Sequence, residues 1–252
     1  MLPVTPHEPD YSMTRVPGST AALIIPALNE EAVIGATLQA IPPGLFYTII
    51  VADNGSTDRT AEIAHAHGAM VVHEPERGYG AACLRALAGL PSAVDTVVFM
   101  QADLSEDPAE ARSLLAPISD GRADLVLGSR TMGKAEKGAL LPHQVFGNWL
   151  STSLIRLLYG HRYTDLGPFR AIRREALERL QMRERNYGWT IEMQVRALEN
   201  SLRVMEVPVT YRVRAAGENK VSGNLRASIA AGAKIISTVF RLRSVSKSGN
   251  RP

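Results

Sequence analysis

The chain has 252 residues, enough for one large domain or two small ones with a sizeable core. Hydrophobic residues make up 45% and charged residues 21%, which excludes a disordered, collagen-like or coiled-coil protein. Cys83 is the single cysteine, so neither an internal disulfide nor a cysteine-based metal cluster can form, and we expect a reducing, cytoplasmic setting. No apolar run approaches the roughly 18 residues that span a bilayer.

The net charge of +3 is unevenly distributed. From Arg203 onward, ten Lys and Arg stand against two Asp and Glu, a local charge of +8, so the preceding residues carry −5. Such a basic segment binds phosphate, nucleic acid or a membrane surface, or is simply solvated, and charge alone leaves these open. Aromatic residues are only 6% of the chain, too few for a base-stacking surface, so we expect no nucleic-acid partner.

Short aliphatic runs predict buried strands of a largely parallel sheet. They are residues 21–26, 48–53, 69–73, 96–101 and 124–128. Helices are expected at 30–41, 58–67 and from Pro108 to about residue 116, with Asn29 capping the first and Ser56 or Thr57 the second. Alternating strands and helices indicate an α/β fold, in which ligands bind beyond the carboxyl ends of the strands.

The second half of the chain is less regular. Residues 146–159 predict a helix, and residues 204–214 predict a strand that Pro208 marks as an edge strand. Residues 225–242 predict an amphipathic helix with one basic face, which either packs on the sheet or lies in a membrane interface. Residues 1–19 carry four prolines and no apolar core of a signal peptide, so we expect a flexible leader there.

Polar side chains follow three of the expected strands. Asp53 can accept hydrogen bonds from a base or ribose, and the Gly-Ser-Thr turn after it opens a helix whose N-terminus favours an anion. Asp103 can hold a divalent cation against a diphosphate, because Mg²⁺ needs only one or two protein carboxylates. Each pattern alone is also typical of an ordinary turn or helix start, so only the combination is informative.

That combination occurs in a fixed order along the chain. The segments are 26–30 (Pro-Ala-Leu-Asn-Glu), 53–58 (Asp-Asn-Gly-Ser-Thr-Asp), 77–82 (Arg-Gly-Tyr-Gly-Ala-Ala), 101–105 (Gln-Ala-Asp-Leu-Ser) and 128–130 (Gly-Ser-Arg), followed by 165–170, 187–192, 206–209 and 217–223. The series resembles the family 2 glycosyltransferases, and within them the dolichol-phosphate mannose synthase and polyprenyl-phosphate glucosyltransferase branch. The likeness runs from about residue 21 to residue 223.

The resemblance implies a GT-A nucleotide-diphospho-sugar transferase fold: α/β, with a mainly parallel sheet and flanking helices. The catalytic domain would span 20–223 and a basic helix and tail 224–252. The residues implied to bind substrate are Pro26, Ala27, Asn29, Glu30, Asp53, Asn54, Gly78, Gln101, Ala102, Arg212 and Arg214. Asp103, with Gln101, would hold Mg²⁺ or Mn²⁺, while Arg130 and Lys220 would act on the acceptor phosphate and the donor diphosphate.

Two positions depart from the family pattern. Gln101 stands where relatives usually carry the first acid of Asp-x-Asp, which removes one negative charge and puts metal dependence in doubt. Asn54 stands where many relatives carry a second acid, but an amide still accepts and donates hydrogen bonds.

The reaction implied is inverting transfer of a hexose from a UDP- or GDP-sugar, with a polyprenyl phosphate as the favoured acceptor. A phosphate needs no general base; a soluble hydroxyl acceptor would need one, for which Asp165 and Glu192 are the candidates. A nucleotide-sugar-binding protein without turnover remains a third hypothesis. The enzyme would be cytoplasmic, either free or peripheral on the inner face of the membrane. Donor base, sugar and oligomeric state stay open.

Overall fold

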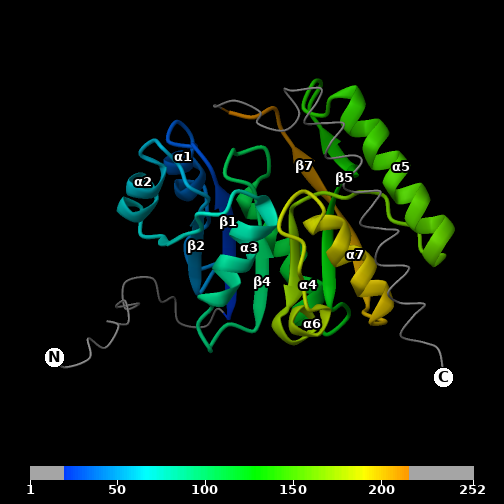
Figure 1. Ribbon diagram of the computed structural model, residues 1–252. Helices are drawn as coiled ribbons and strands as arrows, with labels where there is room; N and C mark the ends of the chain where they lie inside the picture. Colours follow the sequence, from blue (N-terminus) through cyan, green and yellow to red (C-terminus); the bar gives the residue numbers. More distant parts are fainter. Residues whose placement is uncertain (1–19, 216–252) are drawn as a thin grey trace.

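The computed structural model describes residues 20–215 (Figure 1), so the leader, Lys220 and the helix expected at 225–242 lie outside the described residues. The strands are β1 (Ala21–Ala27), β2 (Thr48–Asp53), β3 (Met70–His73), β4 (Thr96–Phe99), β5 (Leu125–Ala135), β6 (Arg170–Arg173) and β7 (Val204–Tyr211). The helices are α1 (Ile34–Gln39), α2 (Thr60–Ala66), α3 (Tyr79–Ala88), α4 (Ala111–Ser119), α5 (Pro142–Tyr159), α6 (Arg174–Leu180) and α7 (Trp189–Glu199), with a 3-10 turn, η2 (Pro108–Glu110), before α4.

Within the described range the strands form one seven-stranded sheet in the order β3-β2-β1-β4-β6-β5-β7. Strands β3, β2, β1 and β4 are parallel, and β7 runs parallel to β5. Strand β6 lies between β4 and β5 and is antiparallel to both. The carboxyl ends of β1, β2, β4 and β5 therefore point to the same edge of the sheet.

Helices cover both faces of the sheet, so the described residues have two apolar clusters (Figure 1). One cluster joins the sheet to α3, α5, α6 and α7, with the fully buried Trp189 at its centre. The other joins it to α1, α2 and α4 through residues such as Ile34 and Leu114. Burial on both faces explains why the first strands read as continuous aliphatic runs.

The five strands expected from the sequence are all present, and the fold class is confirmed. Strand β5 continues well beyond residue 128, with an irregularity between Ser129 and Lys134. Strand β7 ends at Tyr211 and is an edge strand, as Pro208 predicted. The antiparallel β6 and the helices α6 and α7 were not anticipated, because their short segments mix arginines and glutamates with apolar residues.

Three expected helix starts were wrong. Helix α1 begins at Ile34 rather than residue 30, and Asn29 adopts a left-handed conformation instead of capping it. Helix α2 begins at Thr60, whose backbone N–H donates to Asp58 Oδ1, so neither Ser56 nor Thr57 is its cap. Helix α5 begins four residues earlier than expected, at Pro142, because proline fits the first turn of a helix.

Candidate functional site

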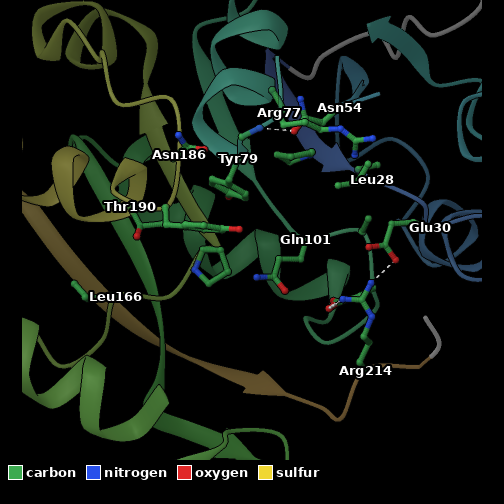
Figure 2. Close-up of a pocket in the computed structure, with 18 of the residues that line it drawn as sticks. Leu28, Glu30, Asn54, Arg77, Tyr79, Gln101, Leu166, Asn186, Thr190 and Arg214 are labelled. Carbon is green, nitrogen blue, oxygen red and sulfur yellow. Dashed lines mark hydrogen bonds and ion pairs between the residues drawn. The ribbon is translucent and has the colours of Figure 1, made fainter. Parts of the chain in front are cut away.

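A cavity of about 450 Å³ opens at the carboxyl ends of β1, β2 and β4, beside Arg130 in the middle of β5 (Figure 2). Ten of the residues singled out from the sequence line it. They are Pro26, Ala27, Glu30, Asn54, Gly78, Gln101, Ala102, Asp103, Arg130 and Arg214. Segments that are far apart in the sequence thus meet at one site, at the position where α/β sheets bind ligands.

Asn54, directly after β2, organises the loop that closes one side of the cavity. Its Oδ1 accepts a hydrogen bond of 2.7 Å from the Gly78 backbone N–H, and its Nδ2 donates to the carbonyls of Glu74 and Glu76. Gly78 has a φ of 153°, and a Cβ there would lie 2.2 Å from the Arg185 carbonyl oxygen. Only glycine allows this close approach of the backbone to the 185–186 segment.

Asp103, after β4, is held in place on both oxygens. Its Oδ1 accepts from the Ser105 backbone N–H at 3.0 Å and hydroxyl at 2.6 Å, and its Oδ2 accepts from Arg214 at 3.1 Å. Arg214 also forms an ion pair with Glu30, so one guanidinium bridges two carboxylates across the cavity (Figure 2). Gln101 lies beside this cluster and presents a neutral amide to the cavity.

Arg130, on β5, is a second positive charge in the cavity lining, and it forms a bidentate ion pair with Asp165. Its Nε and Nη2 each lie 2.7 Å from Asp165, which also accepts from the Arg130 backbone N–H. Burial alone would lower the pKa of Arg130, but hydrogen bonding and attraction to Asp165 raise it overall, so the guanidinium stays charged. Glu206 in turn accepts from the backbone N–H groups of Thr164 and Asp165 and fixes the turn that carries this carboxylate.

Neither candidate base lines the cavity. Both oxygens of the buried Asp165 are bonded to Arg130 and to backbone N–H groups. Glu192 is also buried, with 1% of its surface exposed. Its carboxylate accepts hydrogen bonds from the backbone N–H groups of Arg183 and Glu184 and forms an ion pair with Arg196. The structure therefore places both carboxylates as supports, Asp165 for Arg130 and Glu192 for the segment packed on Gly78 and Gly80.

Three other expected site residues lie near the cavity without lining it. Asp53 is buried, accepting from the Ser56 backbone N–H and contacting His73 Nδ1 at 3.1 Å. Asn29 accepts from the Thr57 backbone N–H, and Arg212 forms an ion pair with Asp107. Asn29 thus joins the loops after β1 and β2, whereas Asp53 fixes the turn after β2 and contacts the end of β3.

The sequence did not single out the other residues that line the cavity. Among the described residues they are Leu28, Arg77, Tyr79, Gln144, Leu166, Pro168, Asn186, Tyr187, Thr190 and Tyr211. Several lie in segments already noted as motifs, at 26–30, 77–82, 165–170 and 187–192, but no spacing rule placed their side chains in the cavity. Tyr79 is the clearest omission, because its buried hydroxyl has no hydrogen-bond partner among the described residues and burial raises its pKa.

Glu106, three residues after Asp103, is buried, with 2% of its surface exposed. Its Oε2 accepts from the Gln101 backbone N–H at 2.8 Å, while Oε1 has no partner among the described residues. Burial raises the pKa of Glu106 to about 8, and the neighbouring Asp103 carboxylate contributes in the same direction. Glu106 thus holds the backbone of Gln101 from beneath the cavity.

The side chains at Asp103 fit a hard cation that arrives with a diphosphate. Within residues 20–215 no group of three or more His, Cys, Asp or Glu could hold a metal ion by itself. Mg²⁺ is commonly held by one or two carboxylates together with substrate phosphates, and the Asp103 carboxylate and Gln101 amide supply oxygens of that kind.

Comparisons with known proteins bear on the family. The model of Glycosyl transferase family 2 matches residues 22–181. The chain belongs to this family. It is 40% identical over 219 residues to an uncharacterized glycosyltransferase of Mycobacterium tuberculosis H37Rv, covering 85% of this chain and 95% of the relative. It is also 31% identical to a polyprenol monophosphomannose synthase of Mycolicibacterium smegmatis, covering 82% and 83% of the two chains.

Among solved structures, the fold is similar to glucosyl-3-phosphoglycerate synthase from Mycobacterium tuberculosis, in complex with Mn²⁺, UDP and glucosyl-3-phosphoglycerate. The TM-score is 0.71 with 27% identity, covering 89% of this chain and 80% of that one. The family 2 chain is therefore a glycosyltransferase with the GT-A fold. Of the helices in the described range, none is both long enough and apolar enough to cross a membrane.

Proposed function

We propose that this family 2 enzyme transfers a hexose from a UDP- or GDP-sugar to a polyprenyl phosphate, with inversion at the anomeric carbon. The observation that carries the proposal is that two arginines, Arg130 and Arg214, and the Asp103 carboxylate line one cavity at the strand ends, with Arg214 paired to Asp103 and Arg130 held by Asp165. Two guanidinium groups match two anionic groups, the donor diphosphate and the acceptor phosphate.

The loops after β1 and β2 would receive the nucleoside, with Pro26, Ala27 and Asn54 lining their side of the cavity. The diphosphate would then lie against Asp103 and Arg214, with Mg²⁺ or Mn²⁺ on the Asp103 carboxylate. When bound, the cation neutralises negative charge that develops on the diphosphate. Glu30 and Asp103 already form ion pairs with Arg214, so the charged side chains that would meet the diphosphate and the cation are held in place.

In the transfer step, the bond from sugar C1 to the diphosphate oxygen breaks and its electron pair leaves on the diphosphate. An oxygen of the acceptor phosphate forms the new bond to C1 from the opposite side, which inverts the centre. Arg130 would hold that phosphate in line. A phosphate is already an anion and gives up no proton, which suits a cavity where Asp165 and Glu192 are both engaged in supporting contacts.

A soluble acceptor is the second candidate function. It is favoured by the structural similarity to a synthase whose complex contains glucosyl-3-phosphoglycerate. A hydroxyl acceptor would need a base, and releasing Asp165 for that role would break its ion pair with Arg130. The lipid phosphate therefore agrees better with the geometry, and it would bring the enzyme to the cytoplasmic face of a membrane.

A thermal-shift screen tests the donor first. We expect a UDP- or GDP-sugar to raise the melting temperature, and Mn²⁺ or Mg²⁺ to increase the shift. Transfer is then measured with short-chain polyprenyl phosphate and, separately, with 3-phosphoglycerate. Transfer to the latter alone would establish the second candidate. Binding without transfer to either acceptor would indicate a nucleotide-sugar-binding protein, and no shift across the panel would contradict the donor assignment.

A further inference from the structure

Helix α5 exposes several large apolar residues to solvent. They are Val145 (52% exposed), Phe146 (59%), Trp149 (60%) and Leu157 (80%), and Ser153 and Arg156 are exposed on the same helix. The four apolar side chains are called the α5 apolar face below. Amphipathic helices of globular proteins normally direct such residues to the core and charges to solvent.

The inward side of α5 is by contrast partly polar. Asn148 accepts from the Leu166 backbone N–H at 2.9 Å and donates to the Thr164 carbonyl, which fixes the turn beside Arg130. Ser151 is buried on the same side, and Gln144 lines the cavity. Helix α5 is thus anchored by hydrogen bonds near the site and by Leu154, Ile155 and Leu158, which pack in the core, while the α5 apolar face points away from the protein.

The part of the α5 apolar face next to the cavity is contiguous, since Phe146 and Trp149 are in contact, with ring centroids 5.8 Å apart, and Val145 adjoins Phe146. The exposed Ser153 and Arg156 lie between this part and Leu157. Arg156 is the single Lys, Arg, Asp or Glu within the 18 residues of the helix, and it lies toward the end that is remote from the cavity. A contiguous exposed patch of this kind marks a binding surface for an apolar partner.

We propose that the α5 apolar face docks on the surface of an anionic lipid membrane and so sets the cavity mouth at the level of the lipid headgroups. Tryptophan and phenylalanine are the side chains that favour the interfacial zone of a bilayer. The +8 charge of the chain from Arg203 onward complements an anionic lipid surface, which attracts basic segments close to it.

The position of α5 links this surface to the site. The helix starts beside the cavity, with Gln144 in its lining and Val145 and Phe146 next in sequence on the outward side. A membrane in contact with these residues lies next to the opening, where a lipid-linked phosphate would enter. The functional consequence of docking rests on the proposed lipid acceptor, whereas docking itself does not.

The decisive measurement is co-sedimentation of the full chain with vesicles of phosphatidylcholine and phosphatidylglycerol. We expect binding to the mixed vesicles and at least tenfold weaker binding for Phe146→Ser/Trp149→Ser. The matched variant Phe146→Leu/Trp149→Leu keeps the face apolar and should retain most of the binding. Equal binding by the serine and wild-type proteins, or no binding to these vesicles, would overturn the proposal.

Tryptophan fluorescence identifies what covers the face. The chain has two tryptophans; Trp189 is fully buried, so Trp149 reports contact with lipid. We expect a blue shift on adding vesicles and quenching by brominated lipid. Protection of Trp149 from iodide in buffer alone would instead indicate coverage by another segment, such as residues 225–242. A dimer that the serine variant dissociates would indicate a second copy of the chain. Either result rules out a free lipid-binding face.

An activity assay separates this inference from the proposed function. With a short-chain, water-soluble polyprenyl phosphate, the serine variant should transfer sugar at the wild-type rate, because neither residue lines the cavity. With a long-chain acceptor in vesicles, its rate should fall at least tenfold. Vesicle binding without transfer to either acceptor would uphold the membrane contact and reject the lipid-acceptor function.

Discussion

The two walls of the cavity are built in different ways. The wall from β1 to β4 consists of loops that directly follow parallel strands, and their backbones are held by side chains such as Asn54 and Asp103. The wall from β5 to β7 is held by buried charges, in which Glu206 fixes the turn carrying Asp165 and Asp165 fixes Arg130. The first wall depends on strand-end geometry, and the second on the pairing of ions far apart in the sequence.

The largest effect is expected in the second wall. Replacing Asp165 by Asn leaves Arg130, whose side chain is 14% exposed, without its charged partner. Breaking such a buried pair costs about 3–5 kcal/mol of unfolding free energy. Denaturant melts should show this loss, whereas Asp120→Asn, in the exposed pair with Arg122, should stay within about 1 kcal/mol. Equal effects would show that the second wall is not held by its buried ion pair.

In the first wall, Asp103→Asn should act on turnover rather than on the fold. Loss of its charge removes the carboxylate proposed to hold the cation, and we expect kcat to fall by at least about 100-fold, as for other lost electrostatic groups. The melting temperature should change little. Glu62→Gln, on the exposed side of α2, serves as the matched charge-loss control. Unchanged turnover would remove Asp103 from the proposed mechanism.

The walls meet where α3 packs on the segment after α6. A Cβ on Gly80 would lie 2.0 Å from the Glu184 carbonyl oxygen, so Gly80→Ala should destabilise the protein by about 1–3 kcal/mol through overpacking. Gly147→Ala on α5 has nothing within 4 Å and should stabilise the helix by up to about 1 kcal/mol. If Gly80→Ala left the free energy of unfolding unchanged in chemical denaturation, the two walls would be able to separate without cost.

The last expected effect appears only in the pH dependence of stability and concerns Glu106, whose pKa is raised by burial to about 8. Its folded pKa exceeds the unfolded value, so folding takes up a proton between about pH 4.5 and 8, and stability declines as pH rises through that window. Glu106→Gln should remove this slope, about 1.4 kcal/mol per pH unit for one proton. Urea titrations of the wild-type protein and Glu106→Gln at several pH values across this window measure the slope. If the unfolding free energies of the two proteins changed in parallel with pH, the raised pKa would be contradicted.

The part of the site that could be predicted from the sequence follows the same division between the two walls. The first wall could be predicted because polar residues after aliphatic strands must share one sheet edge, which placed Asn54, Gln101 and Asp103 together. Tyr79, Asn186 and Tyr187 could not be placed, because their positions depend on how α3 and α7 pack. The role of Glu192 could not be predicted either, because no local pattern shows that a helix carboxylate is buried against the backbone of residues 183 and 184.

The position of Arg214 between Glu30 and Asp103 has a thermodynamic consequence for the proposed ligands. A diphosphate that attracts this guanidinium would leave the Asp103 carboxylate available to a cation, and a cation on Asp103 would release the guanidinium for the diphosphate. Each ligand would thereby strengthen the affinity for the other by the same factor, as linkage requires. A single arginine side chain would then make the two binding events cooperative.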